Sequence, residues 1–303
     1  RPSTEREAMV ASWHRGPIAV TPQRPNEQHY EIPAQFFEVV LGPRLKYSSC
    51  LWPAQVDDLA DAEEAMLRLT VERSGIADGM RVVDLGCGWG SLSLWIAQQF
   101  PAAEVVAVSN SAPQGEFIRH RAREGGLRNV RHLVADVNHL DLDGRFDAAV
   151  SVEMFEHVRN HPLLLERLAA HLQPDAPVFA HVFAHRRHAW EFEDRGAGDW
   201  MARTFFTGGI MPSHVDFQRL VAPYSVEQSW WIDGRHYQRT LEAWLTRLDA
   251  NRGRVRAILE PVFGTEAARW LQRWRMFFMA CSEFFGHADG RLLGVSHHRL
   301  RLA

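Results

Sequence analysis

The ten residues RVVDLGCGWG, numbered 81–90, place a short apolar strand directly before a turn that contains three glycines. Because glycine lacks a Cβ, such a turn at the C-terminal end of a first strand lets a ligand approach the backbone closely. Gly86, Gly88 and Gly90 form the pattern G-x-G-x-G, which differs from the G-x-G-x-x-G fingerprint of dinucleotide-binding proteins. The stretch therefore predicts a ligand-binding turn at the edge of an α/β sheet, but it does not identify the ligand.

Beyond this turn, strand-like and helix-like segments alternate along the chain. Short apolar runs predict strands at residues 81–85, 103–111, 130–136, 146–152 and 176–185. Helix-like segments separate several of them, at residues 91–100, 113–127 and 162–172. This rhythm is typical of a parallel sheet with helices on both faces, so we assign the chain to the α/β class.

The segments on either side of this alternation have different patterns. Residues 26–42 and 57–74 predict two helices, of which the second opens with acids and stops before a glycine. Residues 186–285 hold seven of the eleven Trp, mostly at helix-like spacing, although YSVEQSWWI within them is strand-like. We therefore divide the chain into a tail at 1–25, an N-terminal helical cap at 26–74, an α/β core at 75–185, an inserted helical lid at 186–285 and a last core strand at 286–303.

The composition argues against several classes of protein. The 303 residues are 46% hydrophobic and 23% charged with a net charge of −3, so we expect no nucleic-acid partner. No run approaches the roughly 18 apolar residues of a membrane span, and the start RPSTEREAMV lacks the apolar core of a signal peptide. Cys50, Cys87 and Cys281 lie far apart and have no metal-ligand spacing, so we expect no metal and a reducing, cytoplasmic location.

Polar side chains follow the first three predicted strands. Asp84 stands just before the glycine turn, where an acid can meet the cationic, amino-acid end of S-adenosylmethionine. Asn110 and Gln114 follow the second strand, where their amides can bond ribose hydroxyls. Asp136 ends the third strand, where it can accept a hydrogen bond from an adenine amino group or simply cap the next turn.

The fourth predicted strand runs into SVEMFEHV, residues 151–158, which places two carboxylates and a histidine together. If a helical turn begins near Glu153, Glu156 and His157 follow at i+3 and i+4 on the same face. The carboxylates could hold a substrate ammonium by charge-assisted hydrogen bonds, and a neutral imidazole could take its proton. The alternative is an acid-rich helix start with a solvated histidine, and the protonation state of His157 stays open.

The order DLGCGWG, SNSAPQ, VAD and SVEMFEHV resembles the S-adenosylmethionine-dependent methyltransferases related to cyclopropane fatty acid synthases. NEQHYEIPAQFFEVVLGPRLKYSSCLW and HYQRTLEAWLTRLD are similar to the plant branch, the coclaurine N-methyltransferases. The resemblance implies a Rossmann-like class I methyltransferase sheet with S-adenosylmethionine as cofactor. It also implies that Tyr47 and Ser48 contact the cofactor and that Gly86, Asn110, Gln114 and Asp136 complete its site. We assign Gly88 of the same turn to that site as well. We add a substrate pocket that contains His181, Phe206 and Tyr237.

Two branches of this family differ at positions present in the chain. In the cyclopropane synthases, the residues that match Glu156, His181 and Tyr237 help to hold a bicarbonate ion. Those enzymes carry glycine at the position of Glu153 and cysteine at that of Ser49, so both residues here favour a methyltransferase that acts on a small-molecule amine. Lipid-alkene cyclopropanation and a non-catalytic adenosyl-binding protein remain the alternatives. Whether the chain forms a homodimer stays open.

Overall fold

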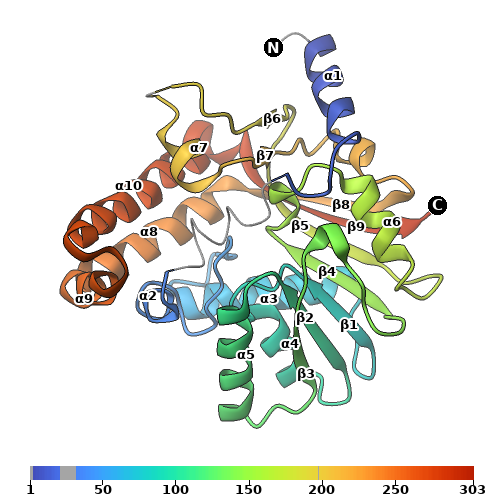
Figure 1. The fold of residues 1–303 in the computed structure, drawn as a ribbon, viewed down its shortest axis with the longest axis horizontal. Helices are drawn as coiled ribbons and strands as arrows, with labels where there is room; N and C mark the ends of the chain where they lie inside the picture. The colour runs from blue at the N-terminus through green and yellow to red at the C-terminus, as the bar shows by residue number, and fades with distance from the viewer. Residues whose placement is uncertain (1–2, 21–31, 197) are drawn as a thin grey trace.

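A computed structural model describes residues 3–20, 32–196 and 198–303 of the protein, and a seven-stranded sheet forms its centre (Figure 1). The strands lie in the order β3-β2-β1-β4-β5-β9-β8. Their bounds are β1 Arg81–Leu85, β2 Glu104–Ser109, β3 Val130–Val134, β4 Ala148–Val152, β5 Val178–His185, β8 Tyr224–Asp233 and β9 Leu293–Leu302. Strands β1 to β5 are parallel, whereas β9 runs antiparallel to both β5 and β8. The predicted α/β class is confirmed.

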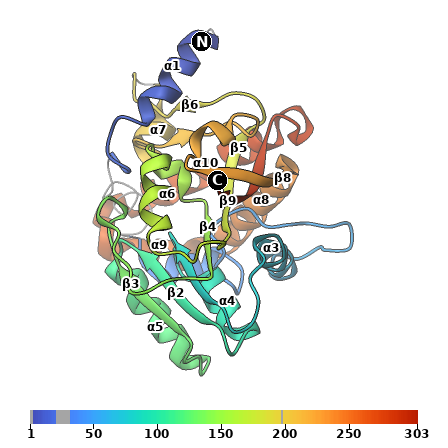
Figure 2. The ribbon, with the colours of Figure 1, turned by 90° about the vertical axis from the view of Figure 1, so that its right-hand side faces the viewer.

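Helices cover both faces of the sheet because alternate side chains of each strand point to opposite faces (Figure 2). Val82 of β1 packs with α3 and α4, whereas its neighbour Val83 packs with α6 on the other face. The bounds are α3 Leu59–Ser74, α4 Ser91–Gln99, α5 Ala112–Glu124 and α6 His161–Ala169. Helix α3 starts where Asp58 accepts a hydrogen bond from the amide of Asp61, and it ends at Gly75 with a φ of 76°, as its sequence predicts.

Most aromatic side chains of the lid region pack into one apolar cluster with the short helix α2. Its elements are α7 Trp200–Phe205, α8 Gly234–Ala250, α9 Arg252–Phe263, α10 Ala267–Gly286, and the two-stranded pair β6 Trp190–Glu191 and β7 Ile210–Met211, while α2 spans Ala34–Val40. The predicted strand at 224–232 is confirmed as β8, the edge strand of the main sheet. The lid is therefore not purely helical, and the division into domains stays a prediction.

The described part of the N-terminal segment packs against the core. Helix α1, Ser3–Trp13, leads into Ile18, which is buried against the sheet. The indole Nε1 of Trp13 donates a 2.7 Å hydrogen bond to Glu191 of β6. The part of the predicted tail and of the 26–42 helix that falls on residues 21–31 lies outside the described residues.

Short 3₁₀ turns complete the structure, at η2 Val137–His139, η3 Phe155–His157, η4 Phe217–Leu220, η5 Gly264–Glu266 and η6 His287–Gly290. Of these, η2 and η3 follow the ends of β3 and β4, where the polar residues of the sequence motifs lie. Among the described helices, none is long and apolar enough to cross a membrane.

Candidate active site

The glycine turn after β1 exposes backbone to a cavity at the carboxyl ends of the strands. Gly86 and Gly88 have φ angles of 82° and 53°, which favour glycine. A Cβ at Gly88 would meet no atom within 4 Å, whereas one at Gly86 would lie 2.5 Å from the side chain of Met154. The turn therefore leaves open space beside the backbone, as the sequence predicts for a ligand-binding loop.

The first cavity lies beyond the ends of β1, β2 and β3. Asn110, Gln114 and Asp136 line it together with Gly86 and Gly88, so the structure brings these predicted residues to one place. Gln114 is 1% exposed, and its amide Nε2 has no hydrogen-bond partner among the described residues. A buried amide without a partner fits a cavity that takes a polar ligand. Asp136 also accepts a bond from the backbone N–H of Asn138, so the capping alternative is true as well.

The second cavity lies between the glycine turn and the N-terminal cap. Tyr47, Ser48 and Asp84 line it, and Ser93 donates a 2.6 Å hydrogen bond to Oδ2 of Asp84. Burial raises the pKa of Asp84 to about 6, and the bond from Ser93 opposes that rise. The predicted cofactor residues of the cap and of β1 therefore face the same space.

The sequence analysis did not predict three buried hydrogen-bond donors in the second cavity. Thr70 Oγ1, Trp89 Nε1 and Ser91 Oγ all lack a partner among the described residues, although each residue lines the cavity. Hydroxyl and indole donors beside an acid suit a ligand end with both a carboxylate and an ammonium group. The two cavities share Gly86, Gly88 and Glu153, so together they fit S-adenosylmethionine with its adenosine and amino-acid ends.

Lys46 is a further residue that sequence reasoning missed. It is 3% exposed, and its Nζ donates to Ser48 Oγ at 2.5 Å and to the carbonyl of Ser49 at 2.8 Å. Burial lowers the pKa of Lys46, whereas the nearby thiol of Cys50 and the carboxylate of Glu153 raise it. A single lysine in an otherwise ordinary KYSS segment gave no pattern that could have revealed this burial.

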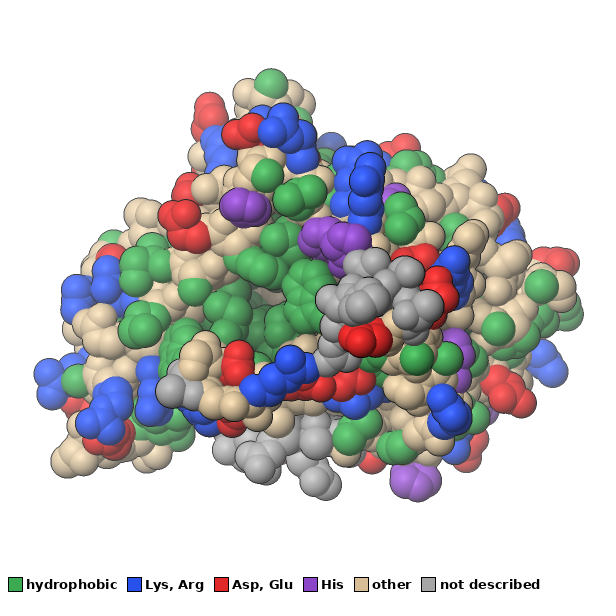
Figure 3. Space-filling model, turned by 90° about the horizontal axis from the view of Figure 1, so that it is seen from above, with side chains coloured by type: hydrophobic (Ala, Val, Ile, Leu, Met, Phe, Trp, Pro, Cys, Tyr) green, Lys and Arg blue, Asp and Glu red, His purple; other side chains and the backbone are tan. Residues whose placement is uncertain are grey.

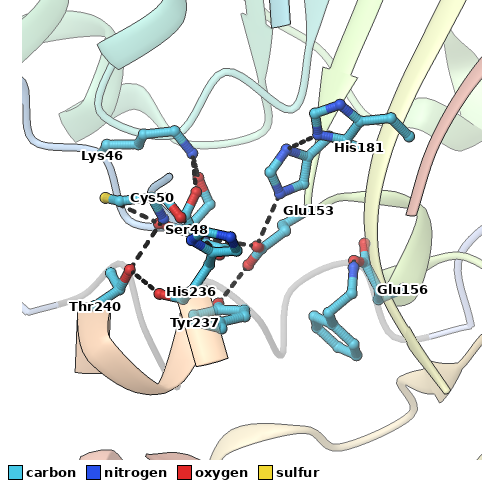
Figure 4. A network of polar contacts seen from close by, with 12 residues as sticks. Lys46, Ser48, Cys50, Glu153, Glu156, His181, His236, Tyr237 and Thr240 are labelled. Atoms are coloured by element: carbon cyan, nitrogen blue, oxygen red, sulfur yellow. Dashed lines mark hydrogen bonds and ion pairs between the residues drawn. The ribbon is translucent and has the colours of Figure 1, made fainter. Parts of the chain in front are cut away.

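Glu153 lies at the centre of the site (Figure 4). Its carboxylate accepts hydrogen bonds from Tyr237 Oη at 2.6 Å and from the backbone N–H of Ser49 at 2.9 Å. Nε2 of His181 lies 3.2 Å from the same carboxylate. Burial raises the pKa of Glu153. The positive charge of Lys46 opposes that rise most strongly, and the hydrogen bond from Tyr237 opposes it next. Glu153 also lines both cofactor cavities and a third, apolar cavity.

The helical turn that we predicted from Glu153 onward is wrong. Glu153 has a φ of 47°, and only Phe155–His157 form a single 3₁₀ turn. Glu156 consequently points away from the cavities and accepts a 2.6 Å hydrogen bond from the backbone N–H of Phe183. It is 1% exposed, and burial together with the charge of Glu153 raises its pKa well above the usual range. By contrast, His157 lines both the adenosine-side cavity and the apolar cavity.

The third cavity is lined almost wholly by apolar and aromatic side chains. Seen from above, hydrophobic side chains gather around a hollow in this face of the molecule (Figure 3). Of the three residues assigned to a substrate pocket from the sequence, Phe206 and Tyr237 line this cavity. The fully buried His181 does not line it and contacts Glu153 instead. Further lining residues from the lid are Trp190, Phe192, Trp244, Phe277, Phe284 and Phe285. Among the described residues, no group of three His, Cys, Asp or Glu side chains could hold a metal ion.

Residues 20–293 match the family model described as mycolic acid cyclopropane synthetase. The chain belongs to the mycolic acid cyclopropane synthetase family. Within this family, it is 35% identical to (S)-coclaurine N-methyltransferase of Thalictrum flavum subsp. glaucum, over 95% of this chain and 81% of the relative. It is 30% identical to cyclopropane-fatty-acyl-phospholipid synthase of Escherichia coli K12, over 90% of this chain and 67% of that protein.

A solved structure of coclaurine N-methyltransferase bound to N-methylheliamine and SAH has the same fold. It superposes with a TM-score of 0.94 at 33% identity, over 99% of this chain and 89% of that one. The likeness therefore covers the N-terminal cap, the sheet and the lid together, and the predicted Rossmann-like methyltransferase architecture is confirmed.

Proposed function

We propose that the chain transfers a methyl group from S-adenosylmethionine to the nitrogen of a small amine of the tetrahydroisoquinoline type. One observation carries this proposal: the carboxylate of Glu153 lies where two polar cavities meet an aromatic one. A flat amine suits aromatic faces, and its ammonium group suits a buried carboxylate. The N-methyltransferase relatives support the same reaction.

The polar cavities would hold the cofactor by groups at both of its ends. Asn110 and Gln114 would bond the ribose hydroxyls, and Asp136 would accept from the adenine amino group. Asp84 would face the ammonium of the amino-acid end, with Tyr47 and Ser48 closing that side. When bound, S-adenosylmethionine supplies an electrophilic methyl group on its sulfonium.

Glu153 and His157 would act on the amine itself. A protonated amine has no free lone pair, so it must lose a proton before it can attack a methyl group. Glu153 would hold the ammonium, and His157, which lines the same cavity, would receive the proton. Glu156 has a different role in this proposal, because its bond to the backbone of Phe183 ties the 3₁₀ turn to β5 and so holds His157 in place.

The lipid-alkene alternative is disfavoured by the partners of Glu153. The resemblance to the cyclopropane synthases implies a bicarbonate ion held with the help of His181 and Tyr237. Here the hydroxyl of Tyr237 donates to the carboxylate of Glu153, and Nε2 of His181 lies 3.2 Å from it. The chain's own carboxylate therefore engages both side chains that such an ion would need. A non-catalytic adenosyl-binding protein would have no use for an aromatic cavity that opens onto the same carboxylate.

An amine screen with methyl-labelled S-adenosylmethionine tests the proposal. We expect label in 1,2,3,4-tetrahydroisoquinoline and its 1-benzyl derivatives. We expect none in phosphoethanolamine, because no lysine or arginine stands among the described residues that line the aromatic cavity. A parallel reaction contains vesicles of unsaturated phospholipid with bicarbonate. Cyclopropanated lipid there, or cofactor binding by calorimetry without transfer to any amine, would overturn the proposal.

We also propose a cytoplasmic location and a homodimer as the assembly. The three cysteines are all free and buried, which suits a reducing compartment. Sedimentation velocity of the purified chain tests the homodimer, because a single species of about 35 kDa would contradict it.

A further inference from the structure

A row of three side chains, two of them fully buried histidines, links helix α3 to Glu153. Arg73, in the last turn of α3, places Nη1 3.0 Å from Nδ1 of His297 on β9. Nε2 of His297 lies 2.9 Å from Nδ1 of His181 on β5, and Nε2 of His181 lies 3.2 Å from Oε1 of Glu153. Both histidines are fully buried, and the Arg73 guanidinium stacks 4.8 Å from the ring centre of Trp230.

The chemistry of arginine gives this row a direction. A guanidinium has only N–H donors, so Nδ1 of His297 must accept and its proton must sit on Nε2. That proton is donated to Nδ1 of His181, whose own proton must then sit on Nε2. His181 therefore presents an N–H, and not a lone pair, to the carboxylate of Glu153.

We propose that Arg73, acting through His297, fixes the tautomer of His181 and thereby keeps a hydrogen-bond donor aimed at Glu153. Arg73, His297 and His181 are positioning residues in this proposal, since none of them lines the aromatic cavity. The effect on methylation rests on the proposed function of Glu153, but the tautomer itself does not.

Burial supports a neutral state for both rings. It lowers the pKa of His181 and of His297 well below the usual range, and the positive charges of Lys46 and Arg73 lower both further. A neutral imidazole has one N–H and one lone pair, so the donor at one end decides the orientation of the whole row.

Loss of the arginine donor would remove this control. His181 could then carry its proton on Nδ1 and turn a lone pair toward Oε1 of Glu153, which disfavours the ionised carboxylate. The other groups that act on the Glu153 carboxyl are Lys46, Tyr237, His157 and the backbone of Ser49, with Glu156 coupled to it by charge. Those groups stay in place when Arg73 is changed. A shift in the pKa of Glu153 in such a variant can therefore be assigned to the contacts from Arg73 through His297 to His181.

Nitrogen-15 NMR of the full chain with labelled histidine, bound to S-adenosylhomocysteine, reads the tautomers directly. We expect Nε2–H for His181 and His297 in the wild type and in Arg73→Lys. In His297→Gln, His181 should keep Nε2–H, because the glutamine amide can still donate to its Nδ1, whereas Arg73→Leu should give Nδ1–H for His181. Arg68→Leu, an exposed change on the same helix, is the matched control and should leave both rings as they are. An Nδ1–H ring for His181 in the wild type would overturn the proposal even if Arg73→Leu fails to fold.

The kinetic arm uses 1,2,3,4-tetrahydroisoquinoline and the pH dependence of kcat/KM. In Arg73→Leu and His297→Phe, we expect the acidic limb of the kcat/KM profile to move up by about 1 pH unit. In Arg73→Lys and His297→Gln, this limb should return to its wild-type position. The proposal would be contradicted if the limb stays in place in Arg73→Leu while only the melting temperature falls. If no amine is methylated at all, the proposed function fails, whereas the NMR result still decides the tautomer.

Discussion

The hydroxyl of Tyr237 donates a 2.6 Å hydrogen bond to Oε2 of Glu153, although the two residues lie 84 positions apart. Tyr237 belongs to α8 of the lid, and Glu153 follows β4 of the sheet. The backbone N–H of Ser49, from the N-terminal cap, donates to the other oxygen of the same carboxylate. One side chain therefore joins cap, core and lid, and its orientation depends on all three.

Replacement of Glu153 by Gln should abolish most turnover while leaving the fold intact. The amide cannot hold an ammonium by a charge-assisted bond, so we expect kcat to fall by about 10²- to 10³-fold. Affinity for S-adenosylhomocysteine, measured by calorimetry, should change less than about threefold, since Gln keeps the shape of Glu.

Glu156→Gln is the matched control for this change. Because burial already raises the pKa of Glu156 well above its usual range, an amide resembles the protonated side chain and can still accept from Phe183. We expect Glu156→Gln to keep most of the activity. Equal losses in the two variants would refute the separate roles given to the two acids.

The pH profile of methylation should reflect the burial of Glu153. Since the ionised form holds the ammonium and burial raises the pKa of Glu153, the acidic limb of kcat/KM should lie above the ordinary range of glutamate. Tyr237→Phe removes a donor that favours the ionised form, so its limb should move further up, by about 1 pH unit. An acidic limb that stays in place or moves down would show that the ionisation of Glu153 does not set it.

The sequence predicted the elements better than the contacts between them. Alternating strands and helices, the glycine turn and the polar residues after each strand were all visible, because they depend on local periodicity and on residue type. The turn at Glu153 was not, because a glutamate at a positive φ has no sequence signature and the local pattern favoured a helix. Tertiary bonds to Ser49, His181 and Tyr237 hold that backbone instead.

The buried partners of the motif residues were equally hidden. Thr70, Lys46 and His297 lie on different elements, and no spacing in the chain relates them to the glycine turn or to Glu153. Only the packing of the cap, which includes α3, and of β9 around the strand ends brings them there. The residue types did not indicate burial either, because Thr and Lys are mostly exposed in folded proteins.

Thr70→Val and Gln114→Leu should each weaken cofactor binding. Within the described part of the chain, each side chain has a buried polar atom without a partner beside a cofactor cavity, so each variant removes a bond that would form only with ligand. We expect the dissociation constant of S-adenosylhomocysteine to rise about 5- to 50-fold, with an unchanged or higher melting temperature for the free protein. A Kd within twofold of the wild type would show that these atoms do not face the ligand.

Glu63→Gln should destabilise the cap that carries Tyr47 and Ser48. The buried carboxylate of Glu63 accepts from the backbone N–H groups of Arg44 at 2.8 Å and of Lys46 at 3.1 Å. An amide would turn its own N–H toward one of these donors, so we expect the free energy of unfolding to fall by about 1–3 kcal/mol.

The free energy of unfolding of the wild type should also depend on pH in a way that Glu63→Gln lacks. Burial raises the pKa of Glu63 from 4.5 to about 7, so the folded state keeps a proton that the unfolded chain has released. The unfolding free energy from this group is therefore highest below pH 4.5 and falls as the pH rises to about 7. Urea unfolding across this range measures the difference.

Glu64→Gln provides the comparison for both effects. Glu64 bonds Arg44 and Trp95 through its side chain, but that side chain is 28% exposed, so water can replace a lost partner. We expect Glu64→Gln to lower the free energy of unfolding by less than about 1 kcal/mol at every pH. If Glu64→Gln costs as much as Glu63→Gln, the two backbone bonds of Glu63 do not hold the cap, and the position of Tyr47 and Ser48 must depend on the Lys46 contacts instead.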